Sequence, residues 1–117
     1  MDKKKTLQED PVQEQIEKQK KRQEINLAHI RGGVTFVDWG NAYIDPEVII
    51  GKGTIIEPGV MLCGRTVIGE NCIIGQGTKI KDSTIADEVE ILYAVILESR
   101  IGSRTTVGPF AYLRPQS

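Results

Sequence analysis

Residues 44–80 read IDPEVI IGKGTI IEPGVM LCGRTV IGENCI IGQGTK I, and every sixth position in this stretch is isoleucine or leucine. The seven aliphatic residues are Ile44, Ile50, Ile56, Leu62, Ile68, Ile74 and Ile80. Four residues after each of them comes a small or β-branched residue, at Val48, Thr54, Val60, Thr66, Cys72, Thr78 and Thr84. A repeat of six residues is typical of a parallel β-helix.

The geometry of such a short repeat explains the pattern. Six residues are too few for a helix and a strand, but they suit a short strand followed by a tight corner. Three steps close one triangular coil, and successive coils stack at a strand spacing of about 4.8 Å. The aliphatic side chain then points inward, the small residue shares the interior, and glycine serves corners where φ is positive. Each coil contacts only its neighbours.

After Ile80 the spacing changes. Three steps shorten to five residues, those from Ile80 to Ile85, from Ile91 to Ile96 and from Ile96 to Ile101, and six then returns. Residues 81–84 and 97–100 become equivalents one coil apart. Stacking the coils gives three interior columns: Ile44/Leu62/Ile80/Ile96/Leu113, Ile50/Ile68/Ile85/Ile101 and Ile56/Ile74/Ile91/Val107. The sequence therefore predicts an all-β solenoid of about four coils.

One helix is expected before the solenoid. Residues 1–9 are polar and predict a flexible tail. Asp10 and Pro11 form a helix start, and Gly32 and Gly33 form a stop, so the helix occupies residues 10–32 and the solenoid residues 33–117. Val12 and Ile16 are the only apolar pair of the first half, which is expected to project. Leu27, Ala28 and Ile30 are expected to dock the second half.

The segment after the helix predicts a short strand at residues 34–37 and a turn at residues 38–41. Trp39, the only tryptophan, lies in this turn. We expect it to cover the open end of the first coil, and a ligand platform is the alternative.

The charge pattern argues against two classes of partner. The 117 residues carry a net charge of −1, and no stretch is long and apolar enough to span a membrane. Lys18, Lys20, Lys21 and Arg22 form a basic cluster, but acidic residues alternate with it and no aromatic residues are interleaved to stack bases. We interpret the cluster as a solvated helix face and expect neither a nucleic-acid nor a membrane partner.

The two cysteines, Cys63 and Cys72, have no metal-binding spacing, and no metal site is predicted. Cys72 lies at an inward position, which favours a packed thiol over a redox group. Such thiols fit a reducing cytoplasm. At the C-terminus, the chain stops at residues 113–117 with no capping repeat, so we expect the first part of a longer solenoid with an open apolar end.

Three segments carry a resemblance to a known family. They are residues 25–34 (INLAHIRGGV), residues 43–46 (YIDP) and residues 106–115 (TVGPFAYLRP). Together they closely resemble the bacterial bifunctional N-acetylglucosamine-1-phosphate uridyltransferase / glucosamine-1-phosphate acetyltransferase over about Gln23 to Pro115. The resemblance implies a linker helix followed by a left-handed β-helix that forms a homotrimer. The left hand comes from the family alone, since parallel crossovers are usually right-handed.

The resemblance also implies a role in making UDP-N-acetylglucosamine, a cell-wall precursor. In the family, the β-helix transfers acetyl from acetyl-CoA to glucosamine-1-phosphate, and an N-terminal domain transfers uridyl with Mg²⁺. That domain has no counterpart here. The histidine that acts as general base in the family lies on coils after the Leu-Arg-Pro motif. The single histidine here, His29, lies on the predicted linker helix. We therefore assign no catalytic residue and no cofactor to this chain, and interpret His29 as a helix-face residue.

One family binding residue carries over. Arg114 matches the arginine that contacts the sugar phosphate, and a guanidinium suits phosphate because it donates two parallel hydrogen bonds. The alternative is an exposed, idle corner arginine. Two functions stay open: a trimerising module that is inactive alone, and an acetyltransferase that works through a separately encoded remainder or another base.

Overall fold

The helix lies within the predicted residues 10–32, and the two end residues of that range are its caps. The computed structural model describes residues 10–115, so the predicted tail at residues 1–9 lies outside the described part. Helix α2 (Pro11–Arg31) begins after Asp10, whose Oδ1 accepts a hydrogen bond from the Val12 amide at 3.0 Å. It ends at Gly32, whose amide donates to carbonyls of the last turn. A side-chain acceptor at the start and a glycine at the end satisfy backbone groups that the helix leaves unpaired.

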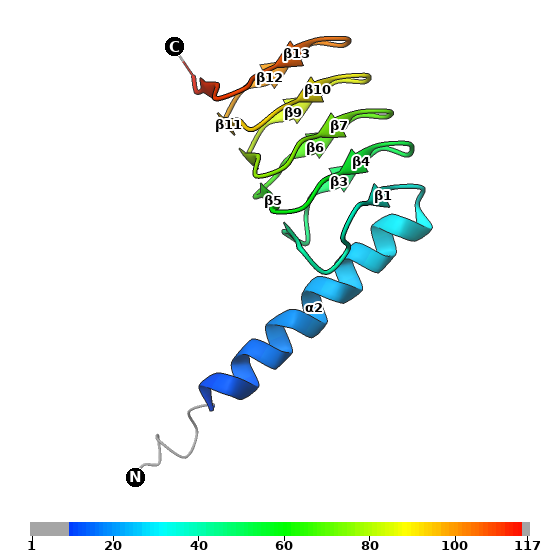
Figure 1. Ribbon diagram of the computed structural model, residues 1–117, viewed down its shortest axis with the longest axis vertical. Helices are drawn as coiled ribbons and strands as arrows, with labels where there is room; N and C mark the ends of the chain where they lie inside the picture. Colours follow the sequence, from blue (N-terminus) through cyan, green and yellow to red (C-terminus); the bar gives the residue numbers. More distant parts are fainter. Residues whose placement is uncertain (1–9, 116–117) are drawn as a thin grey trace.

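Within residues 10–115, fourteen short strands follow the helix and form three parallel sheets, the faces of a prism (Figure 1). The β1 face contains β1 (Thr35–Phe36), β4 (Ile55–Ile56), β7 (Ile73–Ile74), β10 (Glu90–Ile91) and β13 (Thr106–Val107). The β2 face contains β2 (Ala42–Ile44), β5 (Val60–Cys63), β8 (Lys79–Lys81), β11 (Val95–Leu97) and β14 (Tyr112–Leu113). The β3 face contains β3 (Ile49–Ile50), β6 (Val67–Ile68), β9 (Thr84–Ile85) and β12 (Arg100–Ile101).

The strand register confirms the three predicted columns. On the β2 face, for example, Ile44 pairs with Leu62, Leu62 with Ile80, and Ile80 with Ile96. The same register places the five-residue steps correctly, because Ile68 pairs with Ile85. The aliphatic residues in the middle of these columns are fully buried. The parallel β-solenoid expected from the six-residue period is therefore the fold of the chain.

The solenoid is somewhat longer than the predicted four coils. The short strand predicted at residues 34–37 is β1, in which Phe36 pairs with Ile56 and so extends its column by one layer. Phe36 was not included in the columns because it does not continue the aliphatic series. With faces of five, five and four strands, the prism has nearly five coils.

The small interior residues follow the prediction up to Thr78, and the next one does not. Thr84 is exposed, and Ser83 takes the buried position instead. The inward small residue always lies two positions before the next aliphatic residue. In a six-residue step, that position is also four residues after the previous aliphatic residue, but in a five-residue step it is only three residues after it. Because the step from Ile80 to Ile85 is one residue shorter, the inward position moves to Ser83.

Buried hydroxyl groups join successive coils through hydrogen bonds. Thr54 Oγ1 accepts from the Cys72 amide at 3.0 Å and donates to the Gly69 carbonyl at 2.8 Å. Ser83 Oγ likewise accepts from the Ser99 amide at 3.0 Å. Buried polar groups are costly unless they are paired, and these hydroxyls pair with backbone groups that the strand ladder leaves free at the corners.

The second half of α2 docks on the first coil, as expected, but through other residues. Of the three residues expected to dock, Leu27 is half-buried, and Ala28 and Ile30 are exposed. Instead, Ile25 packs against the core and Asn26 is fully buried. The side-chain amide nitrogen of Asn26 donates to the Trp39 carbonyl at 2.7 Å and to the Ala42 carbonyl at 3.1 Å. The expected apolar contact is thus largely replaced by a polar one, because the first coil presents carbonyls that have no coil below them.

The first half of α2 projects from the prism, as Figure 1 shows. Val12 and Ile16 are exposed there, in agreement with the prediction. The side chain of Trp39 is 40% exposed, and it is the Trp39 carbonyl that α2 contacts. Within residues 10–115, no helix has the length and apolar character needed to cross a membrane.

Candidate functional site

Arg114 lies immediately after β14, the last strand within residues 10–115. Figure 1 shows that the C-terminal end of the prism lies away from α2. Arg114 lines a hollow of about 230 Å³ together with residues of the preceding coils. Its guanidinium carbon is 5.8 Å from the centre of the Tyr112 ring, within range of a cation–π contact. The residues that line the hollow are Lys81, Leu97, Glu98, Tyr112, Arg114 and Pro115.

The stacking of coils explains why these side chains meet. Lys81 and Leu97 are paired in the register of β8 and β11, and Arg114 follows Leu113, the partner of Ile96. Lys81, Leu97 and Arg114 therefore occupy the same step of three successive coils. The predicted equivalence of residues 81–84 and 97–100 is confirmed by this register, although Lys81 was not recognised as a neighbour of Arg114.

The hollow brings two cations and one carboxylate together. Glu98 has a φ of 47°, and its amide donates to the Lys81 carbonyl at 2.9 Å. A lysine and an arginine can bind an anion, while a nearby carboxylate can accept a hydrogen bond from an ammonium or hydroxyl group of the same ligand. The hollow therefore suits a small polar ligand that carries both an anionic group and a hydrogen-bond donor.

His29 is not part of this hollow. It lies near the end of α2, at the opposite end of the prism (Figure 1). Partial burial lowers the pKa of His29, because a charged imidazolium is disfavoured away from water. The structure places it on the helix face, as predicted, and does not bring it together with Arg114.

Both cysteines are free thiols, and of the two Cys72 is buried whereas Cys63 is half-buried. Cys72 is fully buried, and its sulfur lies 3.1 Å from the Ala86 carbonyl oxygen. Burial is the main cause that raises the pKa of the Cys63 thiol, and the carboxylate of Asp45 contributes further. A raised pKa reduces the thiolate fraction and hence the reactivity. Among residues 10–115, no group of three or more metal-binding side chains occurs.

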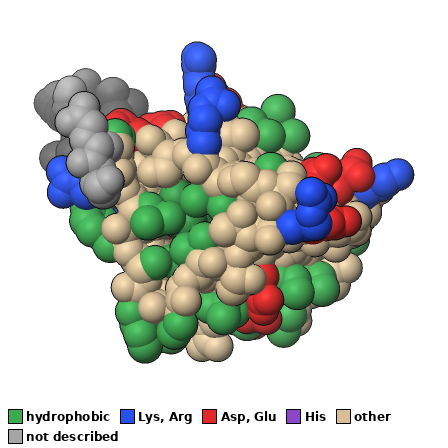
Figure 2. Space-filling view, turned by 90° about the horizontal axis from the view of Figure 1, so that it is seen from above, with side chains coloured by type: hydrophobic (Ala, Val, Ile, Leu, Met, Phe, Trp, Pro, Cys, Tyr) green, Lys and Arg blue, Asp and Glu red, His purple; other side chains and the backbone are tan. Residues whose placement is uncertain are grey.

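An aromatic cluster lies next to the Arg114 hollow. The rings of Tyr93 and Phe110 stack with their centres 5.7 Å apart, and Phe110 is 80% exposed. With Val95 and Tyr112 they line a second hollow of about 340 Å³, so Tyr112 belongs to both hollows. Figure 2, which looks onto the C-terminal end, shows hydrophobic side chains in the middle and along the edges of that end. Exposed aromatic surface of this kind marks contact sites.

Comparison with known proteins gives the family. Residues 39–117 match the model of the GMPPB C-terminal domain. The chain belongs to this family. The match to the GMPPB C-terminal domain covers the solenoid from Trp39 onward, which includes the Arg114 hollow.

Curated relatives extend the similarity. The chain is 50% identical over 96 residues to the bifunctional protein GlmU of Clostridioides difficile, and 56% identical over 91 residues to that of Clostridium botulinum. The GlmU of Staphylococcus haemolyticus is 51% identical over 96 residues. These matches cover 82%, 78% and 82% of the chain, and the chain spans only about a fifth of each relative (21%, 20% and 21%). The resemblance to the bifunctional bacterial enzyme is thereby confirmed.

Proposed function

We propose that the chain forms part of the sugar-phosphate binding side of a hexapeptide-repeat acetyltransferase and is inactive alone. The observation that carries the proposal is Arg114, which follows Tyr112-Leu113 in a hollow that also contains Lys81 and Glu98. The phosphate of glucosamine-1-phosphate suits the two cations, and its amine or hydroxyl groups suit the carboxylate. The family resemblance adds a left-handed winding, a role in UDP-N-acetylglucosamine synthesis and a cytoplasmic location.

The chemistry of acetyl transfer explains why the chain is expected to be inactive. The amine nitrogen of the acceptor attacks the thioester carbonyl of acetyl-CoA, the C–S bond breaks, and coenzyme A leaves as a thiol. A general base must take a proton from the amine. His29 is the single histidine, and it lies at the other end of the prism from Arg114. Transfer by this chain would therefore require a general base other than its single histidine.

We expect the purified chain to bind glucosamine-1-phosphate without releasing thiol from acetyl-CoA above background. Replacing Arg114 by glutamine should weaken this binding by roughly tenfold, because a charge-assisted pair of hydrogen bonds is lost. Isothermal titration measures the binding, and a thiol-reactive dye measures the release.

The matched control is Arg100→Gln, which removes an exposed arginine from β12 on another face. Equal losses for Arg114→Gln and Arg100→Gln would contradict a specific role for Arg114. Thiol release that depends on glucosamine-1-phosphate would establish the second candidate function, an acetyltransferase that works alone or with a separately encoded remainder. If Arg114→Gln also reduced that thiol release, the assignment of Arg114 to the sugar-phosphate site would be retained.

The second part of the proposal is a homotrimer. Its support is the outward side of the β2 face, where five residues succeed one another in register and all but one lysine are apolar or aromatic: Tyr43, Met61, Lys79, Val95 and Tyr112. Met61 and the two tyrosines are exposed, and they are not needed to fill the core, whose middle residues on this face are already fully buried. Such a row would be covered by a second copy of the chain.

Sedimentation equilibrium at micromolar concentration should give the mass of three chains. Replacing Met61 by glutamate should shift the equilibrium toward monomer, because a carboxylate would have to be buried in the interface. Ile49→Glu, on the outward side of the β3 face, is the control and should leave the trimer intact. A stable monomer of the unmodified chain would disprove this part of the proposal.

A further inference from the structure

A third hollow lies between α2 and the first coil, at the end of the prism where the helix docks. Its volume is about 260 Å³. The wall contributed by α2 consists of residues at helical positions i, i+3, i+4 and i+7, which share one face. The residues that line this helix groove are Lys18, Lys21, Arg22 and Ile25 from α2, with Tyr43, Ile44, Asp45 and Pro46 from β2 and the corner after it.

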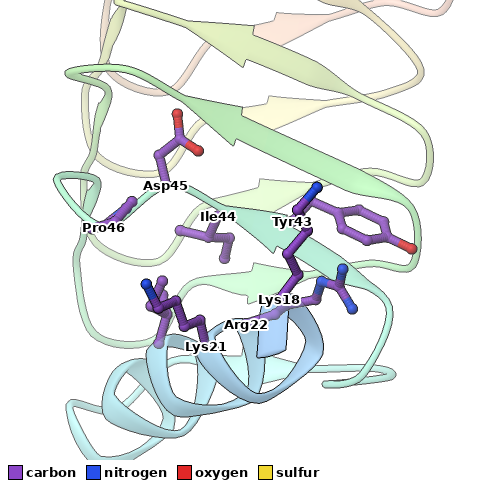
Figure 3. Close-up of a pocket in the computed structure, with 8 residues that line it drawn as sticks. Lys18, Lys21, Arg22, Tyr43, Ile44, Asp45 and Pro46 are labelled. Carbon is purple, nitrogen blue, oxygen red and sulfur yellow. The ribbon is translucent and has the colours of Figure 1, made fainter. Parts of the chain in front are cut away.

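Three cations stand around an apolar floor in the helix groove. Figure 3 shows Lys18 and Arg22 beside Tyr43, with Lys21 toward the side of Pro46. The Arg22 guanidinium carbon lies 4.6 Å from the centre of the Tyr43 ring. Stacking holds the guanidinium plane in place and leaves its N–H edges available for an anion.

The acidic residues of the first coil are engaged elsewhere. In Figure 3 the carboxylate of Asp45 points away from the helix, and its Oδ2 accepts from the Gly64 amide at 2.8 Å. Glu47, in the same corner, lies 3.8 Å from the Arg65 guanidinium. Asp45, the one acidic residue among those that line the helix groove, therefore directs its carboxylate away from the three cations.

The acidic residues of the helix lie on a different side. Glu14 and Glu17 border a separate hollow with Lys18 and Lys21, and neither glutamate lines the helix groove. The Glu17 carboxylate accepts from the Gln13 side-chain amide at 3.3 Å. These glutamates can temper the charge of the two lysines, but they leave the side that faces Tyr43 cationic.

We propose that the helix groove binds a small phosphate-bearing molecule, with the phosphate among Lys18, Lys21 and Arg22. The apolar or ring portion of the molecule packs on Ile44 and Pro46. A doubly charged phosphate matches several cations better than a single carboxylate does. The volume of the groove is slightly below the range of about 300 to 1,000 Å³ that is usual for ligand pockets, so the ligand is small. The site is separate from the Arg114 hollow, and it shares Tyr43 with the row proposed for the trimer interface.

The test uses phenyl phosphate and inorganic phosphate with the ¹⁵N-labelled chain, followed by amide chemical shifts. Carrying it out in Arg114→Gln protein removes the contribution of the other hollow. Saturable shifts are expected at Ile25, Tyr43 and Ile44, and phenyl phosphate should bind more tightly than inorganic phosphate because its ring buries apolar surface. Adding Arg22→Gln should weaken binding by roughly tenfold.

Lys20 provides a matched control. It is an exposed lysine of the same helix that does not line the groove. Lys21→Gln should weaken the binding of phenyl phosphate, whereas Lys20→Gln, which changes the helix charge equally, should not. Equal effects of the two lysine substitutions would overturn the proposal, and so would shifts that do not saturate at millimolar phosphate. If Arg22→Gln does not fold, as judged by circular dichroism, the lysine pair alone decides the question.

Discussion

Replacing Ile74 by alanine should lower the free energy of unfolding by about 2 to 5 kcal/mol. Ile74 is fully buried in β7, where it stacks between Ile56 and Ile91 of the neighbouring coils. The substitution removes apolar contacts and leaves a cavity in a narrow core that has few neighbours able to fill it. Urea denaturation measures the loss as a lower transition midpoint at an unchanged slope.

Ile49→Ala is the control for this prediction. It makes the same chemical change in β3, but Ile49 points outward and is 60% exposed. The expected cost is below about 1 kcal/mol, as for most surface substitutions. Equal losses at the two positions would mean that the interior column does not hold the solenoid together. A larger loss at Ile49 would instead point to a contact that covers the β3 face.

The columns could be predicted because the period alone determines them. A side chain that recurs every six residues takes the same inward position on each successive face, and it returns to the same face after three steps. The register confirms this from Ile44 to Leu113. The prediction that the fourth residue after each aliphatic one points inward was incomplete, because Ser83 is buried where Thr84 was expected. The position of the small interior residue is fixed relative to the next aliphatic residue, not the previous one. In six-residue steps the two rules select the same residue, so only a five-residue step reveals which rule holds.

The docking of α2 could not be predicted from apolar spacing. Asn26 docks because the Trp39 and Ala42 carbonyls of the first coil accept hydrogen bonds from its side chain. The spacing of apolar residues along the helix contains no information about those carbonyls. The sequence singled out Arg114 but not the hollow around it. The Leu-Arg-Pro motif indicated Arg114, and the equivalence of two segments placed Lys81 beside Leu97. The approach of Glu98 depends on a corner with positive φ at a non-glycine residue, which spacing does not specify.

Replacing Gly51 by alanine should cost about 3 kcal/mol, at the upper end of the range for overpacking. A Cβ atom at position 51 would lie 2.6 Å from the carbonyl carbon and oxygen of Gly69, one coil above. Both are backbone atoms, and they cannot move aside like the end of a flexible side chain. The Gly51 amide also donates to the Ile68 carbonyl at 2.9 Å, so the two coils must separate against a hydrogen bond to relieve the clash.

Gly102 offers the matched comparison, because a Cβ atom there would have no neighbour within 4 Å. Gly102→Ala should leave the free energy of unfolding unchanged or raise it by about 0.4 to 1 kcal/mol, since alanine restricts the unfolded chain more than glycine does. The difference between the two alanine variants in urea denaturation therefore isolates the contact between coils. Similar stabilities of Gly51→Ala and Gly102→Ala would show that adjacent coils can part at this corner, and the close stacking of backbone on backbone would then not explain the glycines that follow the aliphatic residues.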